Sequence, residues 1–378
     1  MQETAEILPF DVVIVGGGPA GTATALSLIK HQPSLSIAII EGSQYERPRI
    51  GETLVPIAQP LLRQLEVWER FSNDNHLAAY GTCSAWGGDE LSDNEFIYYP
   101  HNRGWHLDRR VFDRTLADEA VKRGVTLYIA GILVNSRKLA DDQWHLTIQG
   151  KDKSISRIAA SFVVDATGRR AVFARQQGAR KELLDHLLGV FVFFRQNGDQ
   201  PLTDSYTLVE ACEEGWWYSA LIPDARIVVA FMSDADIVKQ HDLKSPPRWF
   251  ESMCKTRYVR GRLSQAEPLT RPAVQAANSH RLDHVAGTDW LAVGDAATTF
   301  DPLSSQGIFK ALRSGILASY AILDHFKGNH TGLERYAAAI AQEYKSYLET
   351  RLEYYSQEQR WPNSPFWQRR HRRSSAKE

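Results

Sequence analysis

The stretch Asp11-Val-Val-Ile-Val-Gly-Gly-Gly-Pro-Ala-Gly21 decides the fold of this chain. It joins an apolar run to glycines at the spacing G-x-G-x-x-G, and a helix of small residues is expected over 22–30. A second apolar run over 35–40 ends in Glu41, at the distance typical of the acid in this motif. The order of strand, tight turn, helix, strand and acid predicts a Rossmann-like β-α-β unit.

Each motif position of this unit has a separate task in binding a dinucleotide. Gly16 permits the turn, Gly18 lets the backbone approach a pyrophosphate, and Gly21 lets the helix pack close to the strand. The helix N-terminus faces the phosphates, and Glu41 can accept hydrogen bonds from a ribose diol. A glycine-rich turn of an ordinary α/β protein is the alternative, but it does not account for the flanking strand, helix and acid together.

Length and composition limit the possible classes of protein. The 378 residues are too many for one small domain and suit two interleaved ones. An apolar content of 43% and a charged content of 24% are ordinary for a globular protein. The net charge of −1 gives no field that would draw nucleic acid or a membrane surface. No apolar run is long enough to span a bilayer, so no membrane span is expected.

The three cysteines, Cys83, Cys212 and Cys254, are odd in number and widely spaced. Without a C-x-x-C pair they indicate neither a disulfide framework nor a zinc site, and no metal is predicted. They suit a reducing compartment. Because the N-terminus shows no basic segment followed by an apolar core, we expect a cytoplasmic protein.

Two further strand ends carry ligand-binding signals. Asp165-Ala-Thr-Gly168 and Gly294-Asp295 each follow an apolar run, as Gly16 does. Ligands of an open parallel sheet lie at the carboxyl ends of its strands, so the three turns should meet at one ligand. Asp295 could bond a polyol chain, although a lone Gly-Asp is usually only a turn. The loop Pro302–Gly307 offers backbone N–H groups and a helix dipole to an electron-rich ring edge, such as that of a flavin.

The middle of the chain changes character, because alternating, β-branched and aromatic residues there suggest an antiparallel sheet. The predicted class is α/β, with a Rossmann-like cofactor-binding domain, an inserted antiparallel-sheet substrate domain and C-terminal helices. The expected segments are 1–85, 107–180 and 286–330 for the discontinuous cofactor-binding domain, 86–106 and 181–285 for the substrate domain, and 331–378 for a C-terminal helix and a basic aromatic tail.

The tail combines Trp361 and Trp367 with the basic run Arg369-Arg-His-Arg-Arg373. Basic chain ends are commonly solvated, and we expect the same here. The tryptophans favour the opposite interpretation, because large apolar side chains seldom lie beside a free tail without packing on something. Binding of an acidic partner is the third alternative.

The motifs together resemble a known family. Gly-Gly-Gly-Pro-Ala-Gly21, Arg49-Ile-Gly-Glu52-Thr, Asp165-Ala-Thr-Gly168, Gly294-Asp295-Ala-Ala and Pro302-Leu-Ser-Ser-Gln-Gly307 are similar to those of FAD-dependent monooxygenases of the para-hydroxybenzoate hydroxylase type. The chain looks closest to the branch of tryptophan halogenases and geranylgeranyl reductases, over essentially its whole length. The resemblance implies FAD as the cofactor. The residues that it places around FAD are Gly16, Gly18, Gly21, Glu41, Arg49 (with Arg47 as the alternative), Arg109, Asp295, Pro302 and Gly307.

Two features of the halogenase branch are altered. That branch carries a catalytic lysine shortly after its Gly-Glu motif, whereas Gly51-Glu52 is followed by no lysine before Lys122. The stretch Gly215–Pro223 resembles the halogenase motif W-x-W-x-I-P, but Tyr218 stands in place of a tryptophan. By the resemblance, the first difference argues against halogenation and the second leaves oxygen insertion open.

Three aromatic segments, Ser84-Ala-Trp86-Gly, Gly104-Trp-His-Leu-Asp-Arg109 and Arg360-Trp-Pro-Asn-Ser-Pro-Phe-Trp367, carry a narrower resemblance. They look like the flavoproteins that mature cysteine tryptophylquinone oxidases. Those flavoproteins act on a tryptophan side chain of a precursor protein. The resemblance therefore implies a protein substrate and a site open enough to admit it.

Candidate catalytic residues are Glu52 and His106. A histidine suits acid–base chemistry near neutral pH, although a hydrogen-bonded structural histidine is the alternative. Glu52 could orient the substrate or cap the helix that follows Pro56. An aromatic pocket would exclude water and orient a ring, and each of its candidates could instead belong to the core. These candidates are Trp86, Trp105, Trp216, Trp217 and Tyr218.

The predicted function is that of an FAD-dependent monooxygenase, which inserts oxygen into an aromatic ring through a flavin C4a-hydroperoxide. The expected target is a tryptophan side chain of a precursor protein during tryptophylquinone cofactor biogenesis. Electrons would come from NAD(P)H or from a flavin reductase, since only one dinucleotide motif is present. The alternatives are a flavin-dependent halogenase or double-bond reductase acting on a small molecule, and a non-catalytic maturation partner.

Overall fold

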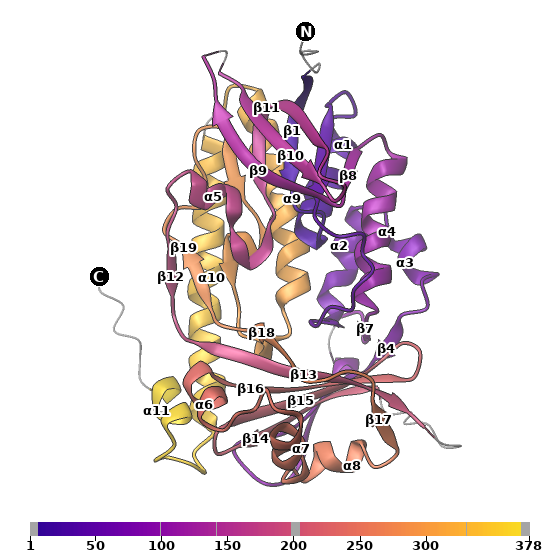
Figure 1. Cartoon of the computed structure of the whole chain (residues 1–378), viewed down its shortest axis with the longest axis vertical. Helices are drawn as coiled ribbons and strands as arrows, with labels where there is room; N and C mark the ends of the chain where they lie inside the picture. The colour runs from indigo at the N-terminus through magenta and orange to yellow at the C-terminus, as the bar shows by residue number, and fades with distance from the viewer. Residues whose placement is uncertain (1–6, 99, 141, 198–204, 330, 372–378) are drawn as a thin grey trace.

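Two β-sheets with helices packed against them form the structure, a computed structural model that describes residues 7–98, 100–140, 142–197, 205–329 and 331–371. In Figure 1 the sheet that contains β1 lies in the upper half, and the sheet that contains β13 crosses below it. The long helix α10 (Thr331–Gln357) runs beside both. None of the described helices is long and apolar enough to cross a lipid bilayer.

The first sheet has the order β8-β2-β1-β11-β10-β9, and β20 pairs with the end of β11. Its parallel strands are β1 (Leu8–Val15), β2 (Ile37–Glu41), β8 (Thr126–Ile129), β11 (Ile155–Asp165) and β20 (Trp290–Ala292), and its antiparallel strands are β9 (Gly131–Lys138) and β10 (Trp144–Gly150). Parallel strands end at one edge of a sheet, so the turns after β1, β11 and β20 meet there, as the sequence predicted.

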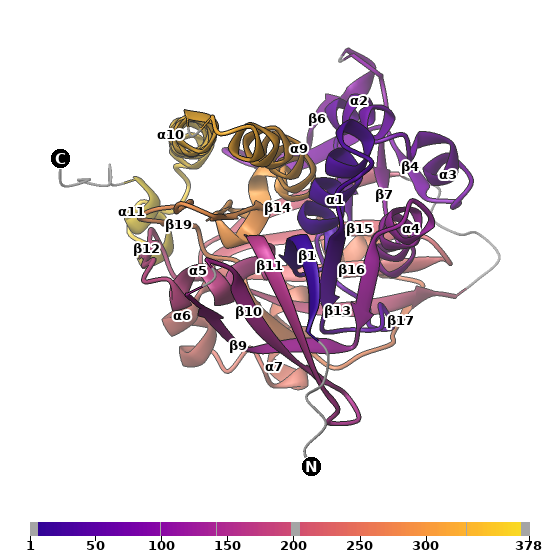
Figure 2. The same ribbon diagram turned by 90° about the horizontal axis from the view of Figure 1, so that it is seen from above.

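Helices α1 (Pro19–His31) and α9 (Gly307–Phe326) cover this sheet, and Figure 2 shows both on the same side of it. They approach closely because small residues face each other. A Cβ atom at Gly315 of α9 would lie 2.5 Å from the carbonyl oxygen of Ala20. The tight contact fixes the beginning of α9 beside the glycine turn that leads into α1.

The second sheet has the order β17-β13-β16-β15-β14-β5-β6, and β18 also pairs with β13. All its pairs are antiparallel except that of β5 with β14. The antiparallel sheet expected for the middle of the chain is therefore present. The strands are β5 (Gly81–Ala85), β6 (Ser92–Glu95), β13 (Leu187–Gln196), β14 (Tyr206–Cys212), β15 (Gly215–Ile222), β16 (Arg226–Asp234), β17 (Ala266–Pro268) and β18 (Ala273–Ala276).

The second sheet separates two regions, because successive side chains of a strand point to opposite faces. On one face, Val229 of β16 packs with Trp249 of α7 (Pro246–Cys254), which Figure 1 shows below the sheet. On the other face, Ala230 and Met232 of the same strand line a cavity between the two sheets. One face therefore completes a core, and the other forms the floor of the cavity.

Smaller elements surround the two sheets. They are the strands β3 (Thr53–Leu54), β4 (Leu77–Ala79) and β7 (Gly104–His106) of one small sheet, β12 (Lys181–Leu183), β19 (His280–Leu282) and β21 (Thr298–Thr299) of another, and the helices α2 (Gln59–Gln64), α3 (Trp68–Ser72), α4 (Arg109–Lys122), α5 (Val172–Gln176), α6 (Ala235–Gln240), α8 (Tyr258–Arg262) and α11 (Pro365–His371).

Strand β5 lies in a different part of the fold from the one expected. The sequence analysis assigned residues 81–85 to the cofactor-binding domain, whereas the structure pairs them with β14 and β6 in the second sheet. Tyr206 of β14 lies opposite Gly81, far along the chain. Local alternation cannot show so distant a pairing. With that exception, we keep the division into segments as a proposal.

The expectation of a solvated basic tail is wrong for residues 369–371. Arg370 is only 2% exposed, and its guanidinium donates to Asp234 at 2.8 Å. Arg369 pairs with Asp234 at 2.8 Å and with Asp236 at 2.6 Å. Asp234 ends β16 and Asp236 lies in the first turn of α6, and nothing in the tail sequence shows where these carboxylates lie. Arg372 and Arg373 fall outside the described residues.

The buried pair makes Arg370 a stability determinant. Replacing Arg370 with methionine leaves the buried carboxylate of Asp234 without its main partner, so the free energy of unfolding should fall by about 3 kcal/mol. Arg248→Met removes an exposed pair with Glu251 and should cost no more than about 0.5 kcal/mol. Urea denaturation of the three proteins measures both values. Equal losses for the two variants would contradict the anchoring of the tail.

Candidate active site

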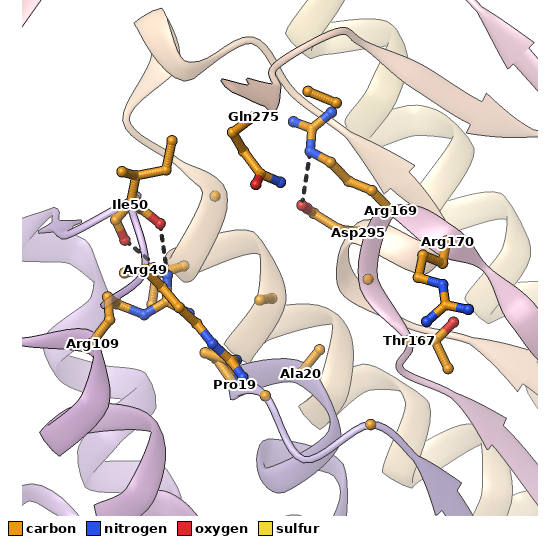
Figure 3. Close-up of a pocket in the computed structure, with 18 of the residues that line it drawn as sticks. Pro19, Ala20, Arg49, Ile50, Arg109, Thr167, Arg169, Arg170, Gln275 and Asp295 are labelled. Atoms are coloured by element: carbon orange, nitrogen blue, oxygen red, sulfur yellow. Dashed lines mark hydrogen bonds and ion pairs between the residues drawn. The ribbon is translucent and has the colours of Figure 1, made fainter. Parts of the chain in front are cut away.

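A cavity of about 750 Å³ lies between the carboxyl edge of the first sheet and the floor formed by the second. Figure 3 shows residues from both sides facing the same space. The loop that follows β1, the turn that follows β11 and the turn that follows β20 all reach it, as does the loop that precedes α9. The cavity is therefore the place where the three predicted turns meet.

The three motif glycines have the geometry that their spacing predicts. Gly16 has φ +115°, and a Cβ there would lie 2.1 Å from the carbonyl oxygen of Ala166. A Cβ at Gly21 would lie 2.0 Å from the carbonyl oxygen of Gly16. At Gly18, by contrast, a Cβ would meet nothing within 4 Å. Of these three glycines, Gly16 and Gly18 line the cavity, and Gly18 is the one with open space for a ligand beside its backbone.

Glu41 stands at one end of the cavity, next to the glycine turn. Its carboxylate accepts hydrogen bonds from the backbone N–H of Gly17 at 2.8 Å and of Ser43 at 2.9 Å. The side chain is buried at 7% exposure. The acid therefore ties the end of β2 to the turn, and it lies where a ribose would follow a pyrophosphate at Gly18.

Two predicted arginines share one buried acid. Asp113 of α4 accepts from Arg109 Nε at 3.0 Å and from an Arg49 guanidinium nitrogen at 3.1 Å. Arg109 also donates to the carbonyl oxygen of Gly51 at 3.0 Å, and Figure 3 shows both arginines on the same side of the cavity. Arg47 does not line the cavity and its side chain is 86% exposed, so the structure favours Arg49 over Arg47.

Asp295 lies at the opposite side of the cavity, between two cations. Its carboxylate is 2.8 Å from Lys310 Nζ and 3.7 Å from Arg169 Nε. Burial alone would raise the pKa of Asp295, but the two cations hold that pKa below its usual value. Figure 3 shows Arg169 and Asp295 joined at the cavity wall. The carboxylate is thus held ionised and ready to accept hydrogen bonds.

The loop Pro302–Gly307 closes the same end of the cavity. Pro302 to Ser304 form a single 3₁₀ turn, and the 20-residue helix α9 begins at Gly307. Asp301 holds this loop by accepting from the backbone N–H of Leu303 at 3.0 Å and from the Tyr355 hydroxyl at 2.8 Å. The N-terminus of a long helix therefore faces the cavity, where it favours an electron-rich group.

Glu52 and Tyr218 meet across the cavity wall. Glu52 comes from the loop after β2, and Tyr218 comes from β15 of the second sheet. The Tyr218 hydroxyl donates to Glu52 Oε1 and lies 2.9 Å from the hydroxyl of Thr53. Burial raises the pKa of Glu52 above its usual value, although the bond from Tyr218 opposes the shift. The pair links the two sheets and places a carboxyl group of high proton affinity at the cavity.

His106 does not line the cavity. It is fully buried in β7, and its Nε2 lies 2.9 Å from the Thr207 hydroxyl. Thr207 in turn hydrogen-bonds Tyr218. The histidine therefore stands behind the wall, and the side chains of Thr207 and Tyr218 lie between it and the Glu52 carboxyl.

Of the five aromatic candidates, only Tyr218 lines the cavity. Trp105 packs nearly at right angles to Phe71 in the hydrophobic core that includes the first sheet, with 5.2 Å between ring centroids. Trp217 belongs to the core below the second sheet. Trp86 and Trp216 pack around the C-terminal helices, in one cluster with Tyr355 and Trp367. Within the chain that the structure describes, the cavity floor is instead formed by Phe191, Val228, Ala230 and Met232.

With the geometry established, comparison with known proteins identifies the family. The sequence profile of tryptophan halogenases matches residues 11–81 and 90–378. The chain belongs to the tryptophan halogenase family. LodB of Marinomonas mediterranea, named as an FAD-dependent oxidoreductase, is 30% identical over 365 residues, which cover 96% of this chain and 97% of LodB. The chain is therefore a flavin-dependent oxidoreductase, with FAD as its cofactor.

Solved structures share the fold. CmlS, a flavin-dependent halogenase, superimposes with a TM-score of 0.86 at 24% identity, over 98% of this chain and 69% of CmlS. QhpG, a peptidyl tryptophan dihydroxylase essential for tryptophylquinone cofactor biogenesis, superimposes with a TM-score of 0.70 at 22% identity, over 96% of this chain and 78% of QhpG. At these identities the likeness concerns the fold alone.

The cavity suits FAD, because its groups follow the order of groups in the cofactor. Glu41 would hold the adenosine ribose, the open backbone at Gly18 the pyrophosphate, and Asp295 the ribityl chain. Pro302 and Gly307 would face the isoalloxazine edge. Among the described residues, no group of three or more histidine, cysteine, aspartate or glutamate side chains could hold a metal ion.

Sequence reasoning missed Lys310, Arg169 and Phe191. Lys310 is only 1% exposed, although it occupies the first turn of α9. A lysine in the first turn of a mainly apolar helix, three residues after a predicted ligand loop, is a signal that could have marked it. Arg169 follows directly after the Asp165–Gly168 motif, and its position there is a signal of the same kind. Phe191 gives no such signal, because only the sheet register turns it toward the cavity.

The open space at Gly18 leads to a prediction about cofactor binding. Gly18→Ala should fold as well as wild type but bind FAD at least about tenfold more weakly, because the added methyl group projects into the cavity. Gly88→Ala, also without a neighbour within 4 Å but away from the cavity, is the matched control. Thermal denaturation of the FAD-free proteins and fluorescence titration with FAD give the two readouts. Unchanged FAD affinity in Gly18→Ala would show that this turn does not hold the pyrophosphate.

The raised pKa of Glu52 leads to a prediction about pH. A carboxyl whose pKa is higher in the folded state stabilises the protein fully below its unfolded-state pKa of about 4.3, and this contribution is lost as pH rises through the folded-state pKa. The free energy of unfolding of wild type, relative to that of Glu52→Gln, should therefore fall as pH rises and then become constant. Urea denaturation from acid to neutral pH measures the difference. Parallel curves for the two proteins would refute the shift.

Proposed function

We propose that this protein is an FAD-dependent monooxygenase that inserts oxygen into an aromatic ring, and that the ring is a tryptophan side chain of a precursor protein. LodB, by its name an FAD-dependent oxidoreductase, supports the flavin chemistry, and QhpG supports the target. LodB is similar over nearly the whole length of both chains, and the fold is shared with QhpG, whose name states peptidyl tryptophan dihydroxylation and tryptophylquinone cofactor biogenesis. The reaction consumes dioxygen, two electrons and two protons, with one oxygen atom going to the ring, which keeps its hydrogen count as a hydroxyl, and the other leaving as water.

The observation that carries the proposal is the absence of lysine from the cavity. Its lining, as far as the structure describes it, contains arginines but no lysine. Halogenation in this family, by the resemblance stated above, depends on a lysine amine near the substrate. The buried Lys310 does not replace it, because its ammonium is engaged by Asp295 and by the carbonyl oxygen of Thr298. An oxygen atom can be transferred without such an amine.

In this proposal the protein side chains exclude water, contact the ring and take up a proton. FAD, when bound and reduced, supplies the activation of dioxygen. Phe191, Ala230 and Met232 exclude water from the cavity floor and offer apolar contact to a ring. The carboxyl of Glu52, which accepts the Tyr218 hydrogen at Oε1, is the group placed to take up the proton that a ring carbon loses when oxygen replaces hydrogen. His106 supports this pair from behind through Thr207.

The source of electrons belongs to the same proposal. The described structure holds one glycine turn of the dinucleotide type, and the cavity beside it is assigned to FAD. We therefore favour a separate flavin reductase over a second nucleotide site on this chain, with NAD(P)H as the ultimate donor.

Halogenation is the second candidate function, and one observation favours it. The family profile that matches most of the chain is that of tryptophan halogenases, and the similar proteins include the pyrrole-carrier-protein chlorinase of Pseudomonas fluorescens. Both functions use reduced flavin and dioxygen, so they differ in what reaches the ring. Labelled dioxygen and bromide distinguish them in one assay.

The holoenzyme, mixed with a flavin reductase, NADH, labelled dioxygen and a tryptophan-containing peptide in bromide buffer, should yield peptide that is heavier by labelled oxygen and free of bromine. Mass spectrometry of the peptide measures both. Tyr218→Phe, which removes the donor to Glu52 but keeps the ring, should slow oxygen insertion by about tenfold, as for one lost hydrogen bond to a charged group. Reproducible bromination in place of oxygen insertion would establish the halogenase and refute the proposal.

A further inference from the structure

Strand β18 is an edge strand that borders the cavity. Within the part of the chain that the structure describes, it pairs only with β13. All four of its residues are exposed, and the apolar side chain of Val274 is 36% exposed. Gln275 and Ala276 line the cavity, and Figure 3 shows the Gln275 side chain turned toward it. The strand therefore joins a free sheet edge to the candidate active site.

The register shows which backbone groups of β18 face outward. The N–H of Ala277 donates to the carbonyl oxygen of Leu187 at 3.0 Å, next to the pair of Ala276 with Leu188. In an antiparallel ladder, hydrogen-bonded and non-hydrogen-bonded pairs alternate. Ala273 and Gln275 therefore exchange hydrogen bonds with β13. The N–H and C=O groups of Val274 and Ala276 point away from it, toward the free edge.

The same register shows where a further strand would place its side chains. Ala273 lies opposite Phe191, Phe191 opposite Ala230, and Ala230 opposite Tyr218. Directly opposed residues of a sheet share one face, and three members of this row line the cavity. A residue added beside Ala273 would continue the row. Its side chain would extend over the cavity floor from the open edge.

We propose that β18 is the docking edge for an extended segment of the protein substrate, which adds to the second sheet as a new strand and places its tryptophan in the cavity. This inference rests on the proposed function, because it names how the protein substrate is held. The backbone groups at the edge supply affinity without regard to sequence, and the cavity selects the aromatic side chain.

The chemistry of the edge favours an extended polypeptide as its occupant. Outward N–H and C=O groups that alternate along a strand are complementary to those of another extended backbone. A small molecule does not present matching groups over the same length. Proteins usually protect such edges with charged residues or proline within the strand. β18 reads Ala273-Val-Gln-Ala276 and has neither. Arg271 and Pro272 come before it, so they limit pairing to this short segment.

Variants at Val274 test the docking edge. Val274→Pro removes one outward N–H without breaking a bond to β13, and edge strands tolerate proline at such positions. Val274→Thr keeps the N–H and the branched side chain, so it is the matched control. Binding of an acetylated, amidated nonapeptide of alternating threonine and valine with one central tryptophan is followed by fluorescence anisotropy. We expect binding to weaken about fivefold for Val274→Pro, as for one lost hydrogen bond, and to stay as in wild type for Val274→Thr.

Modified peptides make the test independent of how the variant folds. N-methylation at alternate residues blocks the backbone donors on one side of a strand. One of the two alternate sets should abolish binding to the wild-type holoenzyme, and the other should leave it nearly unchanged. The ratio of oxidation of the peptide to oxidation of free tryptophan should fall for Val274→Pro, since only the peptide uses the edge.

Three outcomes decide between the possibilities. If both N-methylated sets weaken binding equally, or if neither set weakens it, strand addition is overturned. Strand addition is also overturned if the wild-type protein binds no peptide and sediments as a dimer that Val274→Pro converts to a monomer. A second copy of the chain then occupies the edge. Peptide that binds with the alternating sensitivity but gains no labelled oxygen supports the docking edge, and it refutes the proposed function alone.

Discussion

Parallel pairing of β1 with β11 is the constraint on which the rest of the site depends. It sets Val15 beside Asp165, so that the glycine turn after one strand and the Asp165–Gly168 turn after the other begin at the same level. The pairing of β11 with β20 brings Ala292 to the same level. Segments separated by well over a hundred residues thereby face one space. The tight turn at Gly16 is possible only because no side chain stands between it and the carbonyl oxygen of Ala166.

Charged side chains around this space are paired, each group around one buried member, Asp113 or Lys310, and the pairing explains their positions. Asp113 is shared by Arg49 and Arg109, and Asp295 is shared by Lys310 and Arg169. Buried ion pairs contribute little net stability, because desolvation opposes their attraction, but an unpaired member would be costly. Their effect here is geometric. Each group of ion pairs holds a long side chain or a carboxylate in one orientation beside the cofactor cavity. A solvated side chain would sample many orientations.

The parts of the fold that sequence reasoning found are those with local causes. The glycine spacing reports turn geometry within one segment, so the turn at Gly16 and the close packing at Gly21 could be predicted from the sequence alone. The antiparallel sheet followed from alternation in each strand. The tryptophans could not be assigned in the same way, because Trp217 and Tyr218 are neighbours that point to opposite faces, and only the register shows that the tyrosine faces the cavity. The burial of Arg370 depends on Asp234 in another segment, which the basic run itself does not show.

The two sides of the cavity differ in a way that bears on what it can admit. On one side, the Tyr218–Glu52 hydrogen bond joins the second sheet to the loop after β2 and closes the wall. On the other side, no described strand pairs with the outward N–H and C=O groups of β18, which belongs to the same sheet. A small aromatic molecule needs only the closed pocket. A tryptophan within a polypeptide needs an opening through which its own backbone stays outside, and the free edge of β18 supplies a surface that such a backbone can pair with. The difference between the two walls therefore favours a tryptophan that is part of a polypeptide over a free small molecule.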